Sequence, residues 1–302
     1  EGIPYRTGIA QCRSGAIQCE TGIDDQSIES AMLRLTWQIS QKHKFGVYYD
    51  EINKWRGHGM NSGDDYRTAS QIWTSPKYND GVAKLTSTLS SRLLLEAGFS
   101  MNNEQYVIVN QEGVNQQRGT AAWYAGASRR DQGLGTLVNG FGSGQGGRYP
   151  DRYNILGAMS YITGSHTIKF GMQTNWGPYV NTRETNADLQ QVYTNGVPTL
   201  VTVYNTPIRK TENLVRDMGI FAQDSWSLKR LTLNGGLRWE YLKSEVAASE
   251  AQAGRFVLTP GQQFPAVTMP IWKDIAPRFG AIYDVFGNAK TALKSVSYTH
   301  LT

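Results

Sequence analysis

Long hydrophobic runs are absent from this sequence of 302 residues, in which the densest apolar stretches are as short as residues 93–95 and 107–109. Because a membrane-spanning helix needs about 20 predominantly apolar residues, the sequence excludes a helical membrane protein. It does not exclude a transmembrane β-barrel, since a spanning strand needs only about 10 residues with every second one apolar.

Cysteine and histidine are also scarce, and the net charge is small: the chain has 2 Cys, 4 His and a net charge of +5. Cys12 and Cys19 lie in one polar, glycine-rich segment, where the simplest interpretation is a short-loop disulfide formed in an oxidising compartment. No histidine stands near them in the sequence to complete a metal site. The basic residues are scattered rather than gathered in one stripe, so we expect no nucleic-acid partner.

Regular alternation of apolar and polar residues is what the sequence does contain. Residues 33–39 are apolar at every odd position and polar at every even one, and residues 45–50 repeat the pattern after a short polar turn. Successive strand side chains point to opposite faces, so these segments predict a β-hairpin. The same pattern predicts four more hairpins, formed by residues 82–89 with 93–101, 153–161 with 168–173, 218–222 with 231–240, and 279–285 with 290–293. The predicted fold class is therefore all-β, with about ten antiparallel strands in five hairpins.

Short turns within the hairpins alternate with long polar connections between them, at roughly residues 54–80, 102–150, 176–212 and 242–273. Connections longer than about 15 residues are uncommon in compact domains, whereas outer-membrane barrels combine short periplasmic turns with long extracellular loops. The asymmetry therefore predicts a transmembrane β-barrel whose apolar strand face points to lipid. Aromatic residues near the strand ends favour interfacial girdles, although aromatics also prefer strands in general; they are Trp37, Tyr49, Tyr153, Tyr161 and Trp239.

Several segments are similar to a known family. Residues 219–226 (GIFAQDSW) followed by 230–240 (RLTLNGGLRWE) resemble a barrel hairpin of TonB-dependent outer-membrane receptors. Residues 276–287 (APRFGAIYDVFG) with 290–293 (KTAL) resemble the next hairpin of that family. Together with residues 35–38 (LTWQ), which precede a short turn, they are most similar to the Oar-like branch.

The resemblance implies a barrel of about 22 strands in the outer membrane of a Gram-negative-type bacterium, plugged by an N-terminal domain and energised by the TonB complex. The plug, the TonB box, a carboxypeptidase-like regulatory domain and the C-terminal aromatic are not visible in this sequence. We therefore expect a fragment, with residues 1–294 forming an interior part of the barrel domain. Residues 295–302 break the family pattern and resemble read-through of a sequencing adapter, so we expect a tail that is not native.

Motifs for small-molecule or ion chemistry are weak. Residues 142–147 satisfy the pattern G-x-G-x-x-G, but Pro150 follows closely and the helix that a dinucleotide site requires is not expected, so we interpret them as a flexible loop tip. His58, Asp64 and Asp65 offer an imidazole and two carboxylates, without the spacing of a known ion site. No Ser/His/Asp arrangement is legible either. We predict no catalytic residue, no metal and no cofactor.

Polar positions of the predicted strands would line the barrel lumen: Arg34, Gln38, Glu96, Asn154, Lys169, Gln173, Asn234, Arg238, Glu240, Arg278 and Asp284. They serve either a ligand or, as the more ordinary interpretation, ion pairs with neighbouring strands and the plug. Asp224 and Arg238 would pair across their hairpin in a register that brings them together.

The favoured function is a partial TonB-dependent receptor that imports a scarce nutrient such as a siderophore, corrinoid or carbohydrate. Its expected partners are outer-membrane lipid, the TonB complex and a small nutrient ligand. Aromatic residues of the long connections are candidate ligand contacts, since their rings could stack on a planar or sugar ligand: Trp55, Trp73, Trp123, Tyr124, Trp176 and Tyr179. Two alternatives remain, an Oar-like surface barrel for adhesion or export without import, and a soluble all-β binding module.

Overall fold

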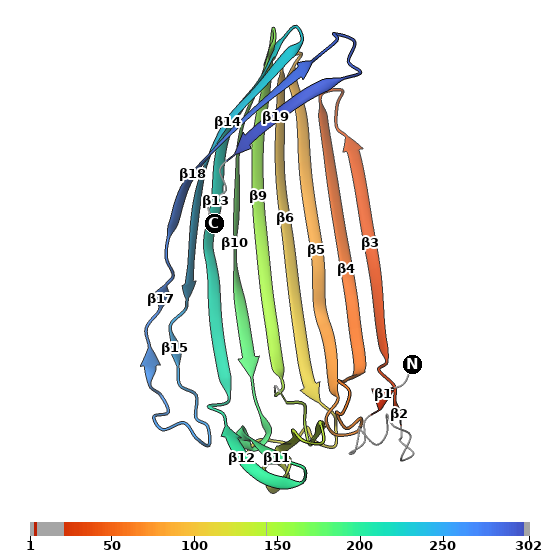
Figure 1. Cartoon of the computed structure of the whole chain (residues 1–302), viewed down its shortest axis with the longest axis vertical. Coiled ribbons are helices and arrows are strands. Elements are labelled where there is room, and N and C mark those ends of the chain that lie inside the picture. Colours follow the sequence, from red (N-terminus) through yellow and green to blue (C-terminus); the bar gives the residue numbers. More distant parts are fainter. Residues whose placement is uncertain (1–2, 5–20, 143, 299–302) are drawn as a thin grey trace.

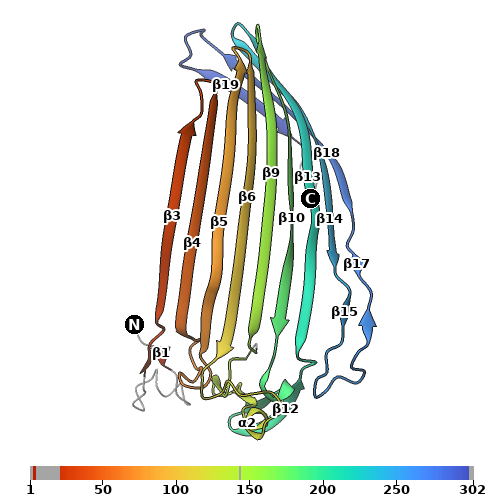
Figure 2. The same ribbon diagram turned by 180° about the vertical axis from the view of Figure 1, so that it is seen from behind.

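The computed structural model describes residues 3–4, 21–142 and 144–298. Ten strands form the main path of one antiparallel sheet, in the order β19-β18-β14-β13-β10-β9-β6-β5-β4-β3 (Figures 1 and 2), and the two-residue strand β17 (Val267–Thr268) pairs with β14 beside it. The bounds of the ten strands are β3 (Gln26–Gln38), β4 (His43–Gly59), β5 (Gln71–Ser90), β6 (Leu93–Asn110), β9 (Gly146–Thr163), β10 (His166–Arg183), β13 (Ile208–Leu228), β14 (Leu231–Val246), β18 (Trp272–Asp284) and β19 (Ala292–Tyr298). The five predicted hairpins and the all-β antiparallel class are confirmed.

Alternation gives the sheet one apolar and one polar face. The cross-strand pairs Leu35↔Val47, Val47↔Ala83, Ala83↔Phe99 and Phe99↔Ile155 run as one row across five strands. Leu35 is 58% exposed, Phe99 40% and Ile155 44%. An exposed apolar belt of this kind is costly in water and favourable in a bilayer. Among the described residues, no helix is long and apolar enough to cross a membrane.

The strands extend well beyond the alternating segments. β10 continues to Arg183 and β13 begins at Ile208, so the connection between them is residues 184–207 rather than 176–212. The other long connections shorten likewise, to residues 60–70, 111–145 and 247–271. The expected boundaries were wrong because alternation is needed only where one face meets lipid. Farther out the alternation ends, as in residues 106–109 (YVIV) of β6, while the backbone ladder continues.

The long connections carry their own structure and gather at one end of the sheet, away from the short turns (Figure 1). They contain α2 (Ala121–Ala125), β7 (Ser128–Asp131), β8 (Thr136–Val138), η1 (Asn186–Asp188), β11 (Leu189–Thr194), β12 (Val197–Val203), β15 (Ser249–Glu250), β16 (Gln263–Phe264) and β17 (Val267–Thr268). A second sheet has the order β12-β11-β7-β8, and its β7–β11 pairing is parallel. This pairing joins the connection before β9 to the connection after β10.

The buried apolar core lies in these connections rather than in the large sheet. Met60, Ala69, Trp123, Leu137 and Phe141 are all buried. Of the buried hydrophobic residues in the described chain, Ala158 alone belongs to the large sheet. We name the packed connections of residues 60–70, 111–145 and 184–207 the loop layer.

Two predicted features fall partly or wholly outside the described residues. Cys12 and Cys19 lie outside them, so their disulfide remains a prediction. Of the suspected tail, residues 295–298 continue β19 and pair with β18, as in Arg278↔Tyr298, whereas residues 299–302 are not described. Near the other end, β1 (Ile3–Pro4) pairs with β2 (Thr21–Gly22).

Candidate ligand-binding site at the long-loop end

The polar residues predicted to line the lumen do share one face of the sheet. Some pair with neighbouring strands: Glu96 lies 3.0 Å from the Lys84 ammonium and 3.4 Å from that of Lys169. Arg238 Nε donates to Glu240 Oε1 at 2.6 Å. These ion pairs support the structural interpretation for the residues that form them.

The suggested pair of Asp224 and Arg238 is wrong. The register places Asp224 opposite Gly235 and Arg238 opposite Phe221, so the two side chains leave opposite faces of their hairpin. Asp224 instead contacts His166, with Nδ1 and Oδ2 2.6 Å apart, near the short turn between β9 and β10.

The six aromatic residues predicted as loop ligand contacts do not gather in one place. Four lie in extended strands, Trp55 in β4, Trp73 in β5, and Trp176 with Tyr179 in β10. Trp176 pairs with Tyr153, which lies on the apolar face of the sheet, and the centres of their stacked rings are 5.8 Å apart. This position suits an interfacial girdle better than a ligand site.

Trp123 and Tyr124 do lie in a connection, in helix α2. Trp123 is only 1% exposed, and the Arg118 guanidinium lies 4.8 Å from the centre of its ring. Tyr124 is 46% exposed, with Arg255 5.2 Å from its ring. Trp123 is therefore part of the loop-layer core, and Tyr124 alone of the six is an exposed loop aromatic.

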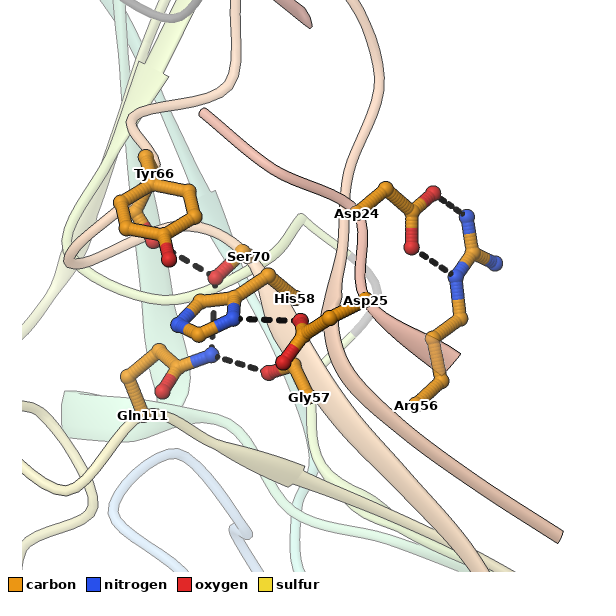
Figure 3. A network of polar contacts seen from close by, with 8 residues as sticks. All are labelled: Asp24, Asp25, Arg56, Gly57, His58, Tyr66, Ser70 and Gln111. Atoms are coloured by element: carbon orange, nitrogen blue, oxygen red, sulfur yellow. Dashed lines mark hydrogen bonds and ion pairs between the residues drawn. The ribbon is translucent and has the colours of Figure 1, made fainter. Parts of the chain in front are cut away.

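The polar groups of the His58–Asp65 region contact other groups of the protein, and Figure 3 shows the contact made by His58. His58 Nδ1 lies 2.7 Å from Asp25 Oδ1, and its ring stacks on Tyr66 at 4.2 Å. Asp65 accepts hydrogen bonds from the backbone N–H and hydroxyl of Thr68. In the part of the chain that the structure describes, no three His, Cys, Asp or Glu residues stand together as metal ligands would.

The glycine-rich segment continues into a strand instead of a helix, because β9 begins at Gly146. Gly144 has φ +76°, and a Cβ there would lie 2.4 Å from the carbonyl oxygen of Glu184. Gln145 and Glu184 exchange two backbone hydrogen bonds at 2.8 and 2.7 Å. Close packing of two connections thus accounts for Gly144, and the nucleotide-binding geometry is not formed.

A cavity of about 550 Å³ lies where the loop layer meets the ends of β4, β5 and β10. Its wall contains three guanidinium groups, three neutral polar or acidic side chains and several apolar or glycine positions: Arg56, Gly59, Met60, Asn61, Asp64, Gln71, Arg130, Leu137, Phe141, Gly142 and Arg183. The cavity therefore combines cationic and other polar groups with a small apolar wall, and its lining would suit a polar ligand.

The arginines of this cavity differ in their partners. Arg56 forms a two-point ion pair with Asp24, with Nε donating to Oδ1 at 2.6 Å (Figure 3). Its hydrogen bonds hold the pKa of Asp24 below the usual range, against the opposing effect of burial. Arg183 lies 4.9 Å from the Tyr204 ring, and its buried Nε has no hydrogen-bond partner. Among the described residues, no carboxylate forms an ion pair with Arg130 or Arg183.

Asp64 is the acidic group of the cavity wall and is only 7% exposed. Burial raises the pKa of its carboxyl group, and hydrogen bonds from the backbone and side-chain nitrogens of Asn61 offset this only in part. The Asp64 carboxyl group therefore binds a proton more readily than a solvated aspartate does.

Backbone hydrogen bonds hold the cavity walls together. Asp65 N–H donates to Leu137 O at 2.8 Å, and Leu137 N–H donates to Gly63 O at 3.0 Å. The Asp131 carboxylate accepts from the N–H groups of Asn195 and Gly196, in the other connection. The cavity is thus bounded by paired backbone rather than by single loop tips.

Sequence reasoning missed this cavity and its arginines. The doublet of Arg129 and Arg130 is visible in the sequence, but Arg183 stands alone and distant from it. Only the parallel pairing of β7 with β11 and the length of β10 bring the two cationic groups to one cavity. The single sequence signal was a basic pair in an otherwise polar connection.

Comparison with known proteins identifies the architecture. A family model described as an outer membrane beta barrel domain matches residues 19–295. The outer membrane transporter YddB from Escherichia coli is similar with a TM-score of 0.60 and 12% identity, over 93% of this chain and 32% of that one. The ferric-catecholate import receptor Fiu from E. coli, in its closed form, has a TM-score of 0.55, with 11% identity over 88% of this chain and 42% of its own. The copper transporter OprC has a TM-score of 0.53, with 10% identity over 96% and 38%.

At these identities the likeness shows the fold alone. The chain spans less than half of the length of each of these three proteins: 32% of YddB, 38% of OprC and 42% of Fiu. No curated protein sequence matches it.

Proposed function

Because the chain belongs to the outer membrane β-barrel domain family, whose model matches residues 19–295, we propose that it is the barrel portion of a TonB-dependent receptor that imports a scarce nutrient. In this family setting the apolar face is the lipid-facing surface, and the loop layer lies at the extracellular end. The family and the exposed apolar face contradict the alternative of a soluble all-β module.

The observation that carries the proposal is the cavity within a hydrogen-bonded loop layer at the extracellular end. A barrel whose loops served only as spacers would not need three connections packed around a shared core. A receptor needs such pre-organisation, since ordering loops at the moment of binding would reduce affinity. The similar solved structures are two transporters and an import receptor, which supports import rather than catalysis.

The nutrient is expected to be a siderophore, a corrinoid or a carbohydrate. Fiu is a receptor for ferric-catecholate and OprC is a copper transporter, and these precedents support a metal-carrying ligand for this chain as well. Energy would reach the barrel through a TonB box and plug in the full-length protein.

Energised uptake by cells tests the proposal. The full-length protein, with and without its TonB box, is expressed in a strain lacking its own copy, and labelled ferric siderophores, cobalamin and maltooligosaccharides are supplied. We expect at least one compound to accumulate only when the protein and its TonB box are present. As a control, a variant in which an equally long segment outside the TonB box is scrambled should take up the compound as the parent does. Import is rejected if no compound accumulates or if deletion of the box changes nothing.

One observation favours surface adhesion as a second function. Strand β12 forms the edge of the loop sheet, and Val197, Leu200, Val201 and Val203 are each more than 50% exposed. An exposed apolar edge strand can pair with another chain. Under this alternative, the double variant Leu200→Lys with Val201→Lys would reduce cell–cell adhesion without altering nutrient uptake. Unchanged adhesion in this variant would reject the adhesion function.

A further inference from the structure

The cavity in the loop layer carries an imbalance of charge. Three of its wall residues are arginines, and one, Asp64, is acidic. Arg56 is neutralised by Asp24 through two hydrogen bonds. Arg130 and Arg183 form no ion pair with a described carboxylate. Arg130 is exposed and feels the charge of Asp64, so these two arginines and Asp64 leave the cavity with one net positive charge.

Arg183 supplies a second, independent sign of a ligand site. Its Nε is buried and has no hydrogen-bond partner. A buried donor without a partner costs more free energy than a hydrogen bond gains, and a guanidinium is a fork of donors that matches an oxyanion. The adjacent Tyr204 ring accounts for one face of the guanidinium but not for this N–H.

The rest of the wall fits an anionic ligand rather than another cation. Asn61 and Gln71 provide side-chain amides, and Gly142 leaves room beside Arg130, where a Cβ would lie 2.8 Å from an Arg130 terminal nitrogen. Met60, Leu137 and Phe141 form an apolar wall. The Asp64 carboxylate accepts hydrogen bonds from the backbone and side-chain nitrogens of Asn61, so it does not need a cation from the ligand.

We propose that this cavity binds an oxyanion group of the ligand, a carboxylate or a phosphate, between Arg130 and Arg183. The proposal rests on the proposed receptor function and narrows the nutrient to an acidic compound or an acidic complex. Each guanidinium would donate to the oxyanion, and the apolar wall would contact the neutral part of the ligand.

Calorimetric titration of the full-length protein in detergent, at fixed pH and ionic strength, tests the site with citrate and inorganic phosphate as separate probes. Arg130→Gln and Arg183→Gln should each weaken binding of the preferred anion by about tenfold, the equivalent of one charge-assisted hydrogen bond. Arg129→Gln is the matched control, because Arg129 neighbours Arg130 in β7 but does not line the cavity. It should leave binding unchanged.

A gain-of-affinity variant protects the test against misfolding. Asp64→Asn retains an oxygen that can accept from Asn61 and removes the negative charge near Arg130, so it should tighten binding of the anion severalfold. The two probes distinguish carboxylate from phosphate recognition. The proposal is overturned if neither anion binds saturably, if the two arginine variants bind as the parent does, or if Arg129→Gln has the same effect as Arg130→Gln.

Uptake separates this inference from the proposed function. Import of a neutral compound that is unaffected by Arg130→Gln and Arg183→Gln would keep the receptor function and reject the anion site. Binding of citrate or phosphate through both arginines, without any TonB-dependent uptake, would keep the site and reject import.

Discussion

Single residues connect parts of the loop layer that are distant in sequence. The Asp131 carboxylate accepts hydrogen bonds from the backbone N–H groups of Leu134, Asn195 and Gly196, at 2.9, 3.0 and 2.7 Å. Burial alone would raise the pKa of Asp131, but these backbone hydrogen bonds outweigh burial and lower it. Its charged form is therefore bound more strongly by the folded loop layer than by the unfolded chain.

Loss of this charge should loosen the β11–β12 turn. Asp131→Asn places an amide N–H₂ against one of the donors, so amide hydrogen exchange at Asn195 and Gly196 should become severalfold faster than in the parent. Glu112→Gln, at an exposed position of the same connection, is the control and should not change exchange there. Equal protection in the parent and in Asp131→Asn would show that the carboxylate does not hold the turn.

The same carboxylate gives the turn a pH dependence. Because the folded-state pKa lies below the unfolded value of about 3.9, the stabilising contribution is fully present above that value. It is lost as the pH falls through the lower, folded-state pKa. After correction for intrinsic exchange rates, protection of Gly196 should therefore stay constant from neutral pH down to about pH 4 and fall below it, and Asp131→Asn should abolish this fall.

At the scale of elements, the sequence could predict what the bilayer imposes. All five hairpins follow from alternation, as in β14, where Leu231, Leu233 and Leu237 share a face with Trp239. The outer ends of the strands were missed because residues such as Arg183 and Ile208 lie where neither face needs to be apolar. The loop sheet was missed because the parallel β7–β11 pairing joins segments whose sequences carry no sign of each other.

The candidate site, like the strands, could be predicted only in part. Trp123 was found as a loop aromatic, but its burial at 1% depends on packing that no local pattern encodes. Arg130 and Arg183 were not selected, since a cavity formed by several segments has no linear motif. Sequence could therefore predict which face meets lipid and at which end the long connections gather, but not which side chains meet there.

The two faces of one strand predict opposite responses to the same charge. Met172 in β10 is 43% exposed on the apolar face, paired with Gly157 and Ile220, and Gln173 follows on the polar face. In the full-length barrel in lipid vesicles, Met172→Lys should lower the free energy of unfolding by about 2–4 kcal/mol, the cost of a lysine near the bilayer midplane. Gln173→Lys, the control, should change it by less than about 1 kcal/mol. Denaturant titration followed by tryptophan fluorescence measures both, and equal effects would contradict the assignment of the faces.

At the scale of the whole molecule, the described sheet is a curved wall rather than a closed barrel (Figures 1 and 2). β3 and β19 are its outer strands, and each leaves a row of backbone groups available for pairing. The modest apolar content of 39% is sufficient because lipid, rather than a second protein layer, covers the apolar face.

These 302 residues alone should therefore aggregate in water, since unpaired edges and an exposed apolar belt both promote association. Light scattering and size-exclusion chromatography after refolding should show large particles without detergent, and discrete species when detergent micelles are present. A soluble monomer in detergent-free buffer would contradict the membrane orientation of the apolar face.

The parallel pairing of β7 with β11 has a consequence for how such a receptor can change over generations. Residues 128–131 of the connection before β9 and residues 190–193 of the connection after β10 share one backbone ladder, so an insertion or deletion within either paired segment shifts the partners of the other. The paired segments cannot vary in length independently, as separate recognition loops could. A change of specificity would have to keep the ladder and alter side chains around it, and a laboratory transplant of recognition between barrels would have to move both connections as a single cassette.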